Sequence, residues 1–196
     1  LKGYDMPQGR PLRVLDLCAA PGGKTTDLAA SLRETCGDSF ILVANEVMKQ
    51  RAGILASNVA LWGDPNVVVT SDDPKDFAAF TEYFDIILAD VPCSGEGMFR
   101  KDEQACEQWS EDNVALCEGR QRRIIADVWA SLADGGVLVY STCTFAEEEN
   151  ELSIQSFLNR HTEFELVDYA APWFEPAFYE LKGAYRLWPH KLHGEG

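Results

Sequence analysis

The chain has 196 residues, of which 46% are hydrophobic and 25% charged, a composition typical of one globular domain. Disordered and collagen-like classes are excluded, and no apolar run approaches the roughly 18 residues that a membrane helix needs. The net charge is −15 at pH 7, opposite in sign to that of a protein that holds nucleic acid by charge alone. The chain starts at Leu1 without a signal-peptide pattern, which indicates a piece of a longer protein.

Short apolar runs alternate with helical patterns through most of the chain. Runs rich in valine, isoleucine and leucine predict five buried strands, at residues 12–17, 40–45, 67–70, 85–90 and 136–141. Helices are predicted between them, at residues 26–33, 48–61 (stopped by Gly63) and 113–132. This order predicts an α/β fold with a doubly wound, mostly parallel sheet.

The chain after the fifth strand is more mixed. Thr144 and Glu147 have the spacing of a capping box, which predicts a helix beginning at Thr144. Its buried face would consist of Ile154, Phe157 and Leu158. Beyond it, the pattern predicts two late strands and a loop rich in proline and aromatic residues, at residues 164–167, 184–188 and 170–180 respectively.

The loop after the first strand is the first candidate ligand site. Residues 18–24 read Cys-Ala-Ala-Pro-Gly-Gly-Lys, and ligands of open α/β sheets bind at such strand ends. A phosphate-binding P-loop is excluded, because Cys18 stands where its leading glycine belongs, and the dinucleotide pattern G-x-G-x-x-G is also absent. Gly22 and Gly23 allow close approach of a ligand to the backbone. The pattern suits a cofactor with an adenosine part and no phosphate.

Acidic residues follow the next two strands. Glu46 ends the second strand, 23 residues after Gly23, at the distance where a carboxylate accepts hydrogen bonds from both ribose hydroxyls of a nucleoside. Asp72 or Asp73, after the third strand, would contact the adenine. Together with the glycine loop, these positions predict S-adenosylmethionine as the cofactor.

Two of the six cysteines stand at the ends of neighbouring strands. Cys93 follows the fourth strand and Cys143 the fifth, so both should open into one cleft near the methyl donor. A free cysteine is more often a small buried hydrophobe, an interpretation that suits Cys36, Cys106 and Cys117. Two thiols suit methylation of cytosine at C5, because a thiolate that adds to C6 makes C5 nucleophilic.

The expected roles follow from that chemistry. Cys143 is the better nucleophile, because the dipole of the helix predicted after it would lower the pKa of its thiol. Cys93 would assist removal of the C5 proton and release of the enzyme. Asp90 could protonate or hydrogen-bond N3 of the ring, and Lys24 would set the electrostatics of the pocket.

Four segments resemble the Sun/Nop family of RNA cytosine-5 methyltransferases. The first three read VLDLCAAPGGKTT (14–26), DVPCSGEGMFRK (90–101) and YSTCT (140–144). The segment RLWPH (186–190), with GEG at 194–196, resembles the end of the catalytic domain in its bacterial ribosomal RNA members of the F type. The match covers nearly the whole chain, so residues 1–196 are expected to form a single catalytic domain.

The resemblance implies a Rossmann-like fold with Cys143 as nucleophile and Cys93 as release cysteine. It prefers Asp73 to Asp72, by register with the family's acidic residue. It also implies RNA-binding segments before and after this chain, which offers an account of the charge of −15. The residues that it implies for S-adenosylmethionine are Cys18, Ala19, Ala20, Pro21, Gly22, Gly23, Lys24, Glu46, Asp73 and Asp90.

The expected partner is RNA, small-subunit ribosomal RNA in preference to transfer RNA, for a monomeric domain in the cytoplasm. No membrane contact is expected, and no metal, since His190 and His193 lack a third ligand at suitable spacing. A non-catalytic S-adenosylmethionine-binding scaffold in ribosome assembly remains an alternative. Amino-group methylation is disfavoured, because residues 90–93 lack its Asn/Asp-Pro-Pro-aromatic motif. The residue 96–103 loop and basic groups near Arg186 are candidates for the entry of a flipped cytosine.

Overall fold

The computed structural model describes residues 4–167, 175–176 and 184–188. The chain divides into two compact units: Leu1–Val91 with Ile124–Ser141, and Pro92–Arg123 with Thr142–Gly196. In chain order the elements, with η marking a short 3-10 helix, are β1 (Leu12–Asp16), α1 (Gly23–Cys36), β2 (Phe40–Asn45), α2 (Lys49–Trp62), β3 (Val67–Thr70), η1 (Pro74–Ala79), β4 (Phe84–Asp90), η2 (Glu96–Met98), α3 (Glu103–Gln108), α4 (Glu111–Val128), η3 (Trp129–Ser131), β5 (Leu132–Ser141), α5 (Glu151–Leu158), β6 (Glu175–Pro176) and β7 (Tyr185–Arg186).

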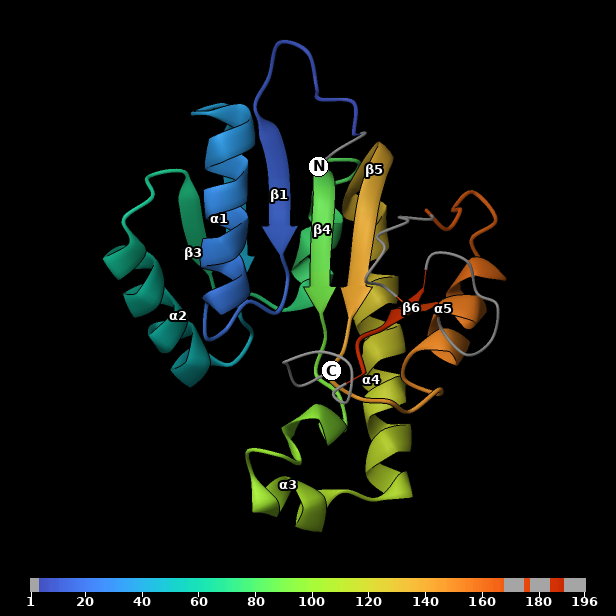
Figure 1. Ribbon diagram of the computed structural model, residues 1–196. Helices are drawn as coiled ribbons and strands as arrows, with labels where there is room; N and C mark the ends of the chain where they lie inside the picture. The colour runs from blue at the N-terminus through green and yellow to red at the C-terminus, as the bar shows by residue number, and fades with distance from the viewer. Residues whose placement is uncertain (1–3, 168–174, 177–183, 189–196) are drawn as a thin grey trace. The chain divides into compact units, whose positions relative to one another are not determined.

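A five-stranded parallel sheet forms the centre of the first unit. Its strand order is β3-β2-β1-β4-β5, and Figure 1 shows the arrowheads of β1, β4 and β5 at the same end. The chain moves outward in one direction from β1 to β3 and then crosses to β4 on the other side of β1. The carboxyl end of β1 therefore lies at the point where the strand order reverses, which is where open α/β sheets bind ligands.

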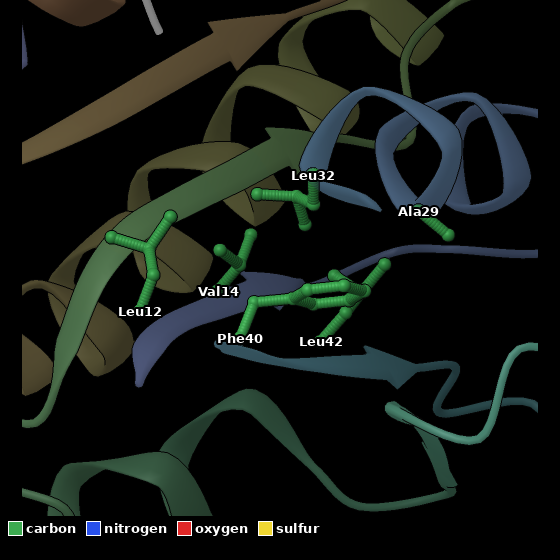
Figure 2. Close-up of a cluster of buried hydrophobic side chains, with 6 residues drawn as sticks. All are labelled: Leu12, Val14, Ala29, Leu32, Phe40 and Leu42. Atoms are coloured by element: carbon green, nitrogen blue, oxygen red, sulfur yellow. The ribbon is translucent and has the colours of Figure 1, made fainter. Parts of the chain in front are cut away.

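The core of this unit joins the sheet to α1. A cluster of six side chains, each no more than 1% exposed, comes from β1, β2 and α1, and Figure 2 shows it: Leu12, Val14, Ala29, Leu32, Phe40 and Leu42. Burial of each large apolar side chain stabilises the fold by about 1.5–3 kcal/mol. This packing holds the β1 end and the start of α1 in fixed positions.

All five predicted strands are present in the sheet. β2 and β3 have the predicted bounds, whereas β5 begins at Leu132, four residues before its prediction. Residues 134–136 (Asp-Gly-Gly) are typical of a turn, but here they are part of the strand, beside an irregularity in its pairing with β4. A Cβ at Gly136 would lie 2.8 Å from the Ala133 carbonyl oxygen, so glycine permits a close backbone approach there.

The helices of the first unit also follow the predictions. Helix α1 is longer at both ends than expected and starts directly after Gly22, whose φ of +112° is in the range that favours glycine. Helix α2 ends as predicted, because Gly63 (φ +79°) donates its N–H to the Val59 carbonyl. The short 3-10 helix η1 was not predicted.

In the second unit, the prediction of a helix beginning at Thr144 is wrong. Helix α5 begins at Glu151, and the Thr144 hydroxyl accepts a hydrogen bond from the Ala146 N–H instead of capping a helix with Glu147. The buried face is partly correct: Phe157 is buried, while Ile154 and Leu158 are half-buried.

The late strands are also only partly correct. Residues 164–167 form no strand, and within residues 184–188 only Tyr185–Arg186 (β7) does, in a short antiparallel pair with β6. The predicted loop at 170–180 lies outside the described residues except for β6. Helix α3 was not predicted; Asp102 caps it by accepting the Gln104 N–H.

Candidate active site

The loop after β1 is fixed by side chains of helix α2. Arg51 donates to the Ala20 carbonyl at 2.8 Å, and Asn58 donates to the Pro21 carbonyl at 2.7 Å. Gly22 completes the turn, and a Cβ there would lie 3.2 Å from Leu55 Cδ1. The loop is therefore held from the helix side through its carbonyls. The first N–H groups of α1, which follow it, have no acceptor within the helix and suit a polar ligand.

Glu46 carries a buried hydrogen-bond acceptor beside this loop. The residue is 3% exposed, and its Oε1 accepts the Met48 N–H at 2.9 Å. Oε2 lies 3.1 Å from Arg51 Nη1 as an ion pair, yet it has no partner of good hydrogen-bond geometry in the described part of the chain. An acceptor of this kind fits the hydroxyl donors of a ribose, as the sequence predicted for the cofactor.

Asp16, at the end of β1, is a candidate that the sequence analysis did not single out. It is 1% exposed, its Oδ2 accepts the Thr25 hydroxyl at 2.6 Å, and its Oδ1 is buried without a partner among the described residues. Burial raises its pKa to about 6, against the lowering effect of the Thr25 hydrogen bond. The sequence feature that could have identified Asp16 is its place as an acidic residue just before a glycine loop, where the strand order of the sheet reverses.

Cys18 lies near the same two carboxylates, and its thiol is protonated at neutral pH. Burial, followed by the nearby Glu46 and Asp16 carboxylates, raises the pKa of Cys18 to about 12. The thiolate is the reactive form of cysteine, so Cys18 is suited to lining a pocket and not to nucleophilic attack.

Lys24 and Asp90, both predicted as site residues, are in direct contact. Lys24 Nζ lies 2.8 Å from Asp90 Oδ2, and the Ser141 hydroxyl donates to Asp90 Oδ1 at 2.6 Å. This trio brings together the start of α1 and the carboxyl ends of β4 and β5. Both oxygens of Asp90 therefore accept hydrogen bonds, and Ser141 joins the predicted pair.

The two acids considered for adenine have different local roles. Asp73 caps η1 by accepting the Lys75 N–H at 3.2 Å and exchanging a reciprocal hydrogen bond with Asp76. Asp72 is held by its backbone, since its N–H donates to Asn45 Oδ1 and its carbonyl accepts from Asn45 Nδ2. These contacts do not distinguish Asp72 from Asp73 as the contact to adenine, and Asp73 stays a prediction.

In the second unit, the two predicted catalytic cysteines are in contact. Their sulfur atoms are 3.2 Å apart, and the Cys143 N–H donates to the Cys93 sulfur at 3.3 Å. The hydrogen bond with Cys143, followed by burial, raises the pKa of the Cys93 thiol. The sequence predicted that these cysteines lie together, although 49 residues separate them in the chain.

The argument that a helix dipole activates Cys143 is wrong. Helix α5 begins eight residues beyond Cys143, whereas the dipole acts within about one turn. The residues after Cys143 are held by Glu96, whose Oε2 accepts the Phe145 N–H at 2.6 Å and the Thr144 hydroxyl at 3.0 Å. No local pattern links Glu96 to Phe145, which explains why the sequence analysis missed it.

Arg186 does not belong to an exposed basic surface. It is 7% exposed, forms a double hydrogen bond with Glu151 at 2.9 and 2.5 Å, and donates to the Phe145 carbonyl at 2.8 Å. Its charge is thus used inside the second unit, and it is a poor candidate for contact with substrate phosphates. Lys182, His190 and Lys191, which accompany it in the sequence, lie outside the described residues.

Residues 4–167, 175–176 and 184–188 contain neither a membrane-spanning helix nor a cluster of metal ligands. In that part of the chain no helix has the length and apolar character to cross a membrane. The same residues contain no group of three or more histidine, cysteine or acidic side chains arranged to hold a metal ion.

The strand order, the glycine loop after β1 and the acid after β2 define a Rossmann-like methyltransferase of the S-adenosylmethionine-dependent class. More specifically, the chain belongs to the family described as 16S rRNA methyltransferase RsmB/F, whose model matches residues 7–196. The resemblance to the Sun/Nop group is thus confirmed, as is S-adenosylmethionine as the cofactor of the family.

Individual relatives agree with this assignment. The ribosomal RNA small subunit methyltransferase F of Shewanella denitrificans is 36% identical over 98% of this chain, which spans 38% of that relative. The crystal structure of the protein PH0851 matches 94% of this chain and 41% of its own, with 34% identity and a TM-score of 0.85. The crystal structure of NSun6 from Pyrococcus horikoshii with SFG matches 91% of this chain and 44% of the NSun6 chain, with 28% identity and a TM-score of 0.73. The chain therefore spans less than half the length of these relatives.

Proposed function

We propose that this chain is the catalytic part of an RNA cytosine-5 methyltransferase acting on small-subunit ribosomal RNA. The observation that carries the proposal is the pair of thiols, Cys93 and Cys143, with sulfur atoms 3.2 Å apart. A methyltransferase that modifies an amino or hydroxyl group has no use for two adjacent thiols, whereas C5 of cytosine must be activated by a nucleophile at C6. The small-subunit methyltransferase F of Shewanella denitrificans supports ribosomal RNA as the substrate.

The residues proposed to hold S-adenosylmethionine belong to the first unit. Glu46 would accept hydrogen bonds from the ribose through Oε2, its oxygen without a partner among the described residues, and Asp73 would approach the adenine. Residues 18–24 would line the remainder of the cofactor, with Gly22 and Gly23 allowing close approach. When bound, the cofactor supplies the methyl group.

In the proposed reaction, Cys143 forms the covalent bond to the cytosine. Its sulfur, as the thiolate, would add to C6, and the electron pair of the C5–C6 double bond would take the methyl group, so that a C5–CH₃ bond forms as the bond between the methyl group and the cofactor's sulfur breaks. Asp90 would hydrogen-bond N3 as charge develops on the ring, with Lys24 and Ser141 fixing its carboxyl group.

Cys93 is proposed to act in the second half of the reaction. The proton on C5 leaves, its bonding electrons re-form C5=C6, and the C6–S bond breaks to release Cys143. The contact with the Cys143 thiol is the largest cause of the raised pKa of Cys93. Once the Cys143 sulfur is bonded to carbon that cause is removed, so the pKa of Cys93 falls and more of it is present as the thiolate, which is the form that takes the C5 proton.

A covalent-trapping experiment on the full-length protein tests this function. We would mix the Cys93→Ala variant with S-adenosylmethionine and small-subunit ribosomal RNA and run a denaturing gel. A protein–RNA band is expected that disappears in the Cys93→Ala/Cys143→Ala double variant. Cys106→Ala is the matched control, because Cys106 is an exposed thiol on α3 that has no proposed role.

The alternatives predict different gels. A band with transfer RNA and none with ribosomal RNA would move the substrate to transfer RNA. No band with either RNA, with cofactor binding intact, would favour a non-catalytic scaffold in ribosome assembly. Full methyl transfer by Cys143→Ala would overturn the assigned nucleophile. The proposal implies a cytoplasmic enzyme, because ribosomal RNA of bacteria is made and assembled there.

A further inference from the structure

Glu149 is a buried carboxylate that the proposed reaction does not use. It is 0% exposed and lies between Cys143 and helix α5 in the chain. Its oxygens accept the Ser94 N–H at 3.0 and 3.3 Å, and Oε2 also accepts from Gln121 Nε2 at 2.6 Å. A carboxylate is costly to bury unless donors surround it, and the Ser94 N–H and Gln121 Nε2 are such donors.

Gln121 extends this contact to the other side of Cys93. It is also 0% exposed, and the same Nε2 donates to the Pro92 carbonyl at 2.9 Å. The backbone groups on both sides of Cys93, the Pro92 carbonyl and the Ser94 N–H, are therefore fixed by Gln121 and Glu149.

The Cys143 segment is held by a different carboxylate. Glu96 accepts the Phe145 N–H and the Thr144 hydroxyl, and the Gly97 N–H donates to the Cys143 carbonyl at 2.6 Å. One carboxylate thus fixes the residues beside Cys93, and another fixes those beside Cys143. Loss of one anchor should affect mainly the thiol that it holds.

We propose that Glu149, with Gln121, is a positioning residue that aims the Cys93 thiol for the release half of the reaction. The inference rests on the proposed function. Because Glu149 accepts the Ser94 N–H beside Cys93, its loss displaces the release thiol most. The Cys143 segment keeps its anchor on Glu96 and is linked to Ser94 indirectly, through the 2.9 Å contact between the Ser94 and Thr144 hydroxyls. Displacement by about 1 Å can cost roughly a hundredfold in rate. The variant therefore forms the covalent adduct and resolves it slowly.

The test measures formation and resolution of the adduct separately. Full-length Glu149→Ala is mixed with S-adenosylmethionine and small-subunit ribosomal RNA, and the covalent band is followed after a chase with unlabelled RNA. We expect adduct formation within about twofold of wild type and resolution slowed about tenfold or more. The values of kcat and KM should then fall together, because kcat/KM reports the unchanged steps up to adduct formation. Glu149→Gln should recover part of the rate, because its amide oxygen can still accept the Ser94 N–H.

Glu148→Ala is the matched control, because Glu148 is the exposed neighbour of Glu149 in the same segment, and it should behave as wild type. Gln121→Met, which removes the donor to Pro92 and Glu149 with little change in volume, is the second variant and should also accumulate adduct. This variant keeps the test decisive if Glu149→Ala does not fold.

Three results would overturn the inference. These are resolution at the wild-type rate in both variants, equal slowing of formation and resolution, and accumulation of adduct by Glu148→Ala. The Cys93→Ala variant separates this inference from the proposed function. If Cys93→Ala traps no adduct, the cytosine-5 mechanism fails; if it traps adduct and the Glu149 and Gln121 variants do not, only the positioning role fails.

Discussion

The carboxylates near the cofactor loop and those near the thiols differ in whether the described chain supplies hydrogen-bond donors to them. Near the loop, Glu46 Oε2 and Asp16 Oδ1 are buried with no hydrogen-bond partner among the described residues. Near the thiols, Glu149 and Glu96 each accept backbone N–H groups from the segment that they hold. A buried acceptor without a donor destabilises a fold by about 1–3 kcal/mol unless a ligand supplies the donor. The first region is therefore built for binding, and the second is built to keep its own backbone in place.

This contrast predicts that changes in the two regions have separable effects. Variants of the first region should alter cofactor affinity or stability, and those of the second should alter covalent chemistry. The loop of the first region is held through its carbonyls by Arg51 and Asn58. The thiol segments are held through N–H groups by two carboxylates, and also through the Pro92 and Cys143 carbonyls.

The largest effect is expected for Cys143→Ala. Without the attacking sulfur, C5 of the cytosine is not activated, so methyl transfer to RNA should fall by at least about a thousandfold. The dissociation constant for S-adenosylmethionine, measured by calorimetry, should stay within about twofold of wild type. A large loss of cofactor affinity in this variant would contradict the separation of the two regions.

Asp16→Asn is expected to change how stability depends on pH. The folded pKa of Asp16, about 6, lies above its ordinary value of 3.8, so this group's stabilising contribution is complete below about pH 3.8 and is lost as the pH rises through 6. Through this group the wild type should lose up to about 3 kcal/mol of its free energy of unfolding between pH 4 and pH 7. Asp16→Asn should not show that loss. Urea unfolding at both pH values measures it.

Asp27→Asn serves as the control for this measurement, since Asp27 is an exposed acid on α1. Equal pH slopes in the wild type and Asp16→Asn would show that the buried carboxyl group does not titrate in this window.

Glu46→Ala should weaken S-adenosylmethionine by about 2 kcal/mol, or roughly thirtyfold in dissociation constant, because hydrogen bonds to a charged acceptor are lost. Adduct formation at saturating cofactor should be nearly unchanged. Calorimetry gives the affinity, and Glu34→Ala, an exposed acid on α1, is the control. Unchanged affinity would remove Glu46 from the proposed cofactor site.

The smallest effect is expected for Asn58→Ala. It removes one donor to the Pro21 carbonyl, a contribution of about 1 kcal/mol, so cofactor affinity should fall about fivefold. Ser57→Ala is the matched neighbour, because the Ser57 hydroxyl donates to the Gly53 carbonyl within α2 and, among the described residues, holds no part of the loop. If the two variants bind the cofactor equally, the hold of α2 on the loop does not matter for binding.

Local patterns were sufficient to predict the sheet of the first unit. The run 40–45 is apolar on both faces, as a strand covered on both sides must be, and its bounds are correct. The bounds of 67–70 are also correct, although β3 lies at the edge of the sheet and Val68 is exposed. Gly63 was also a reliable signal for the end of α2, because a backbone φ of +79° favours glycine at that one position. The second unit was harder, because Thr144 and Glu147 have the spacing of a helix start but Thr144 is hydrogen-bonded to Glu96.

The chain of amino acids by itself determined the fold class, the glycine loop and the pair of cysteines, because each depends on residue type and short spacing. The tertiary structure alone decided which groups the buried carboxylates contact. Glu149 meets Ser94 across 55 positions, and Glu96 meets Phe145 across 49. The physical reason is that a buried carboxylate must find donors wherever the packed chain brings them, and no periodic pattern encodes a contact between segments so far apart.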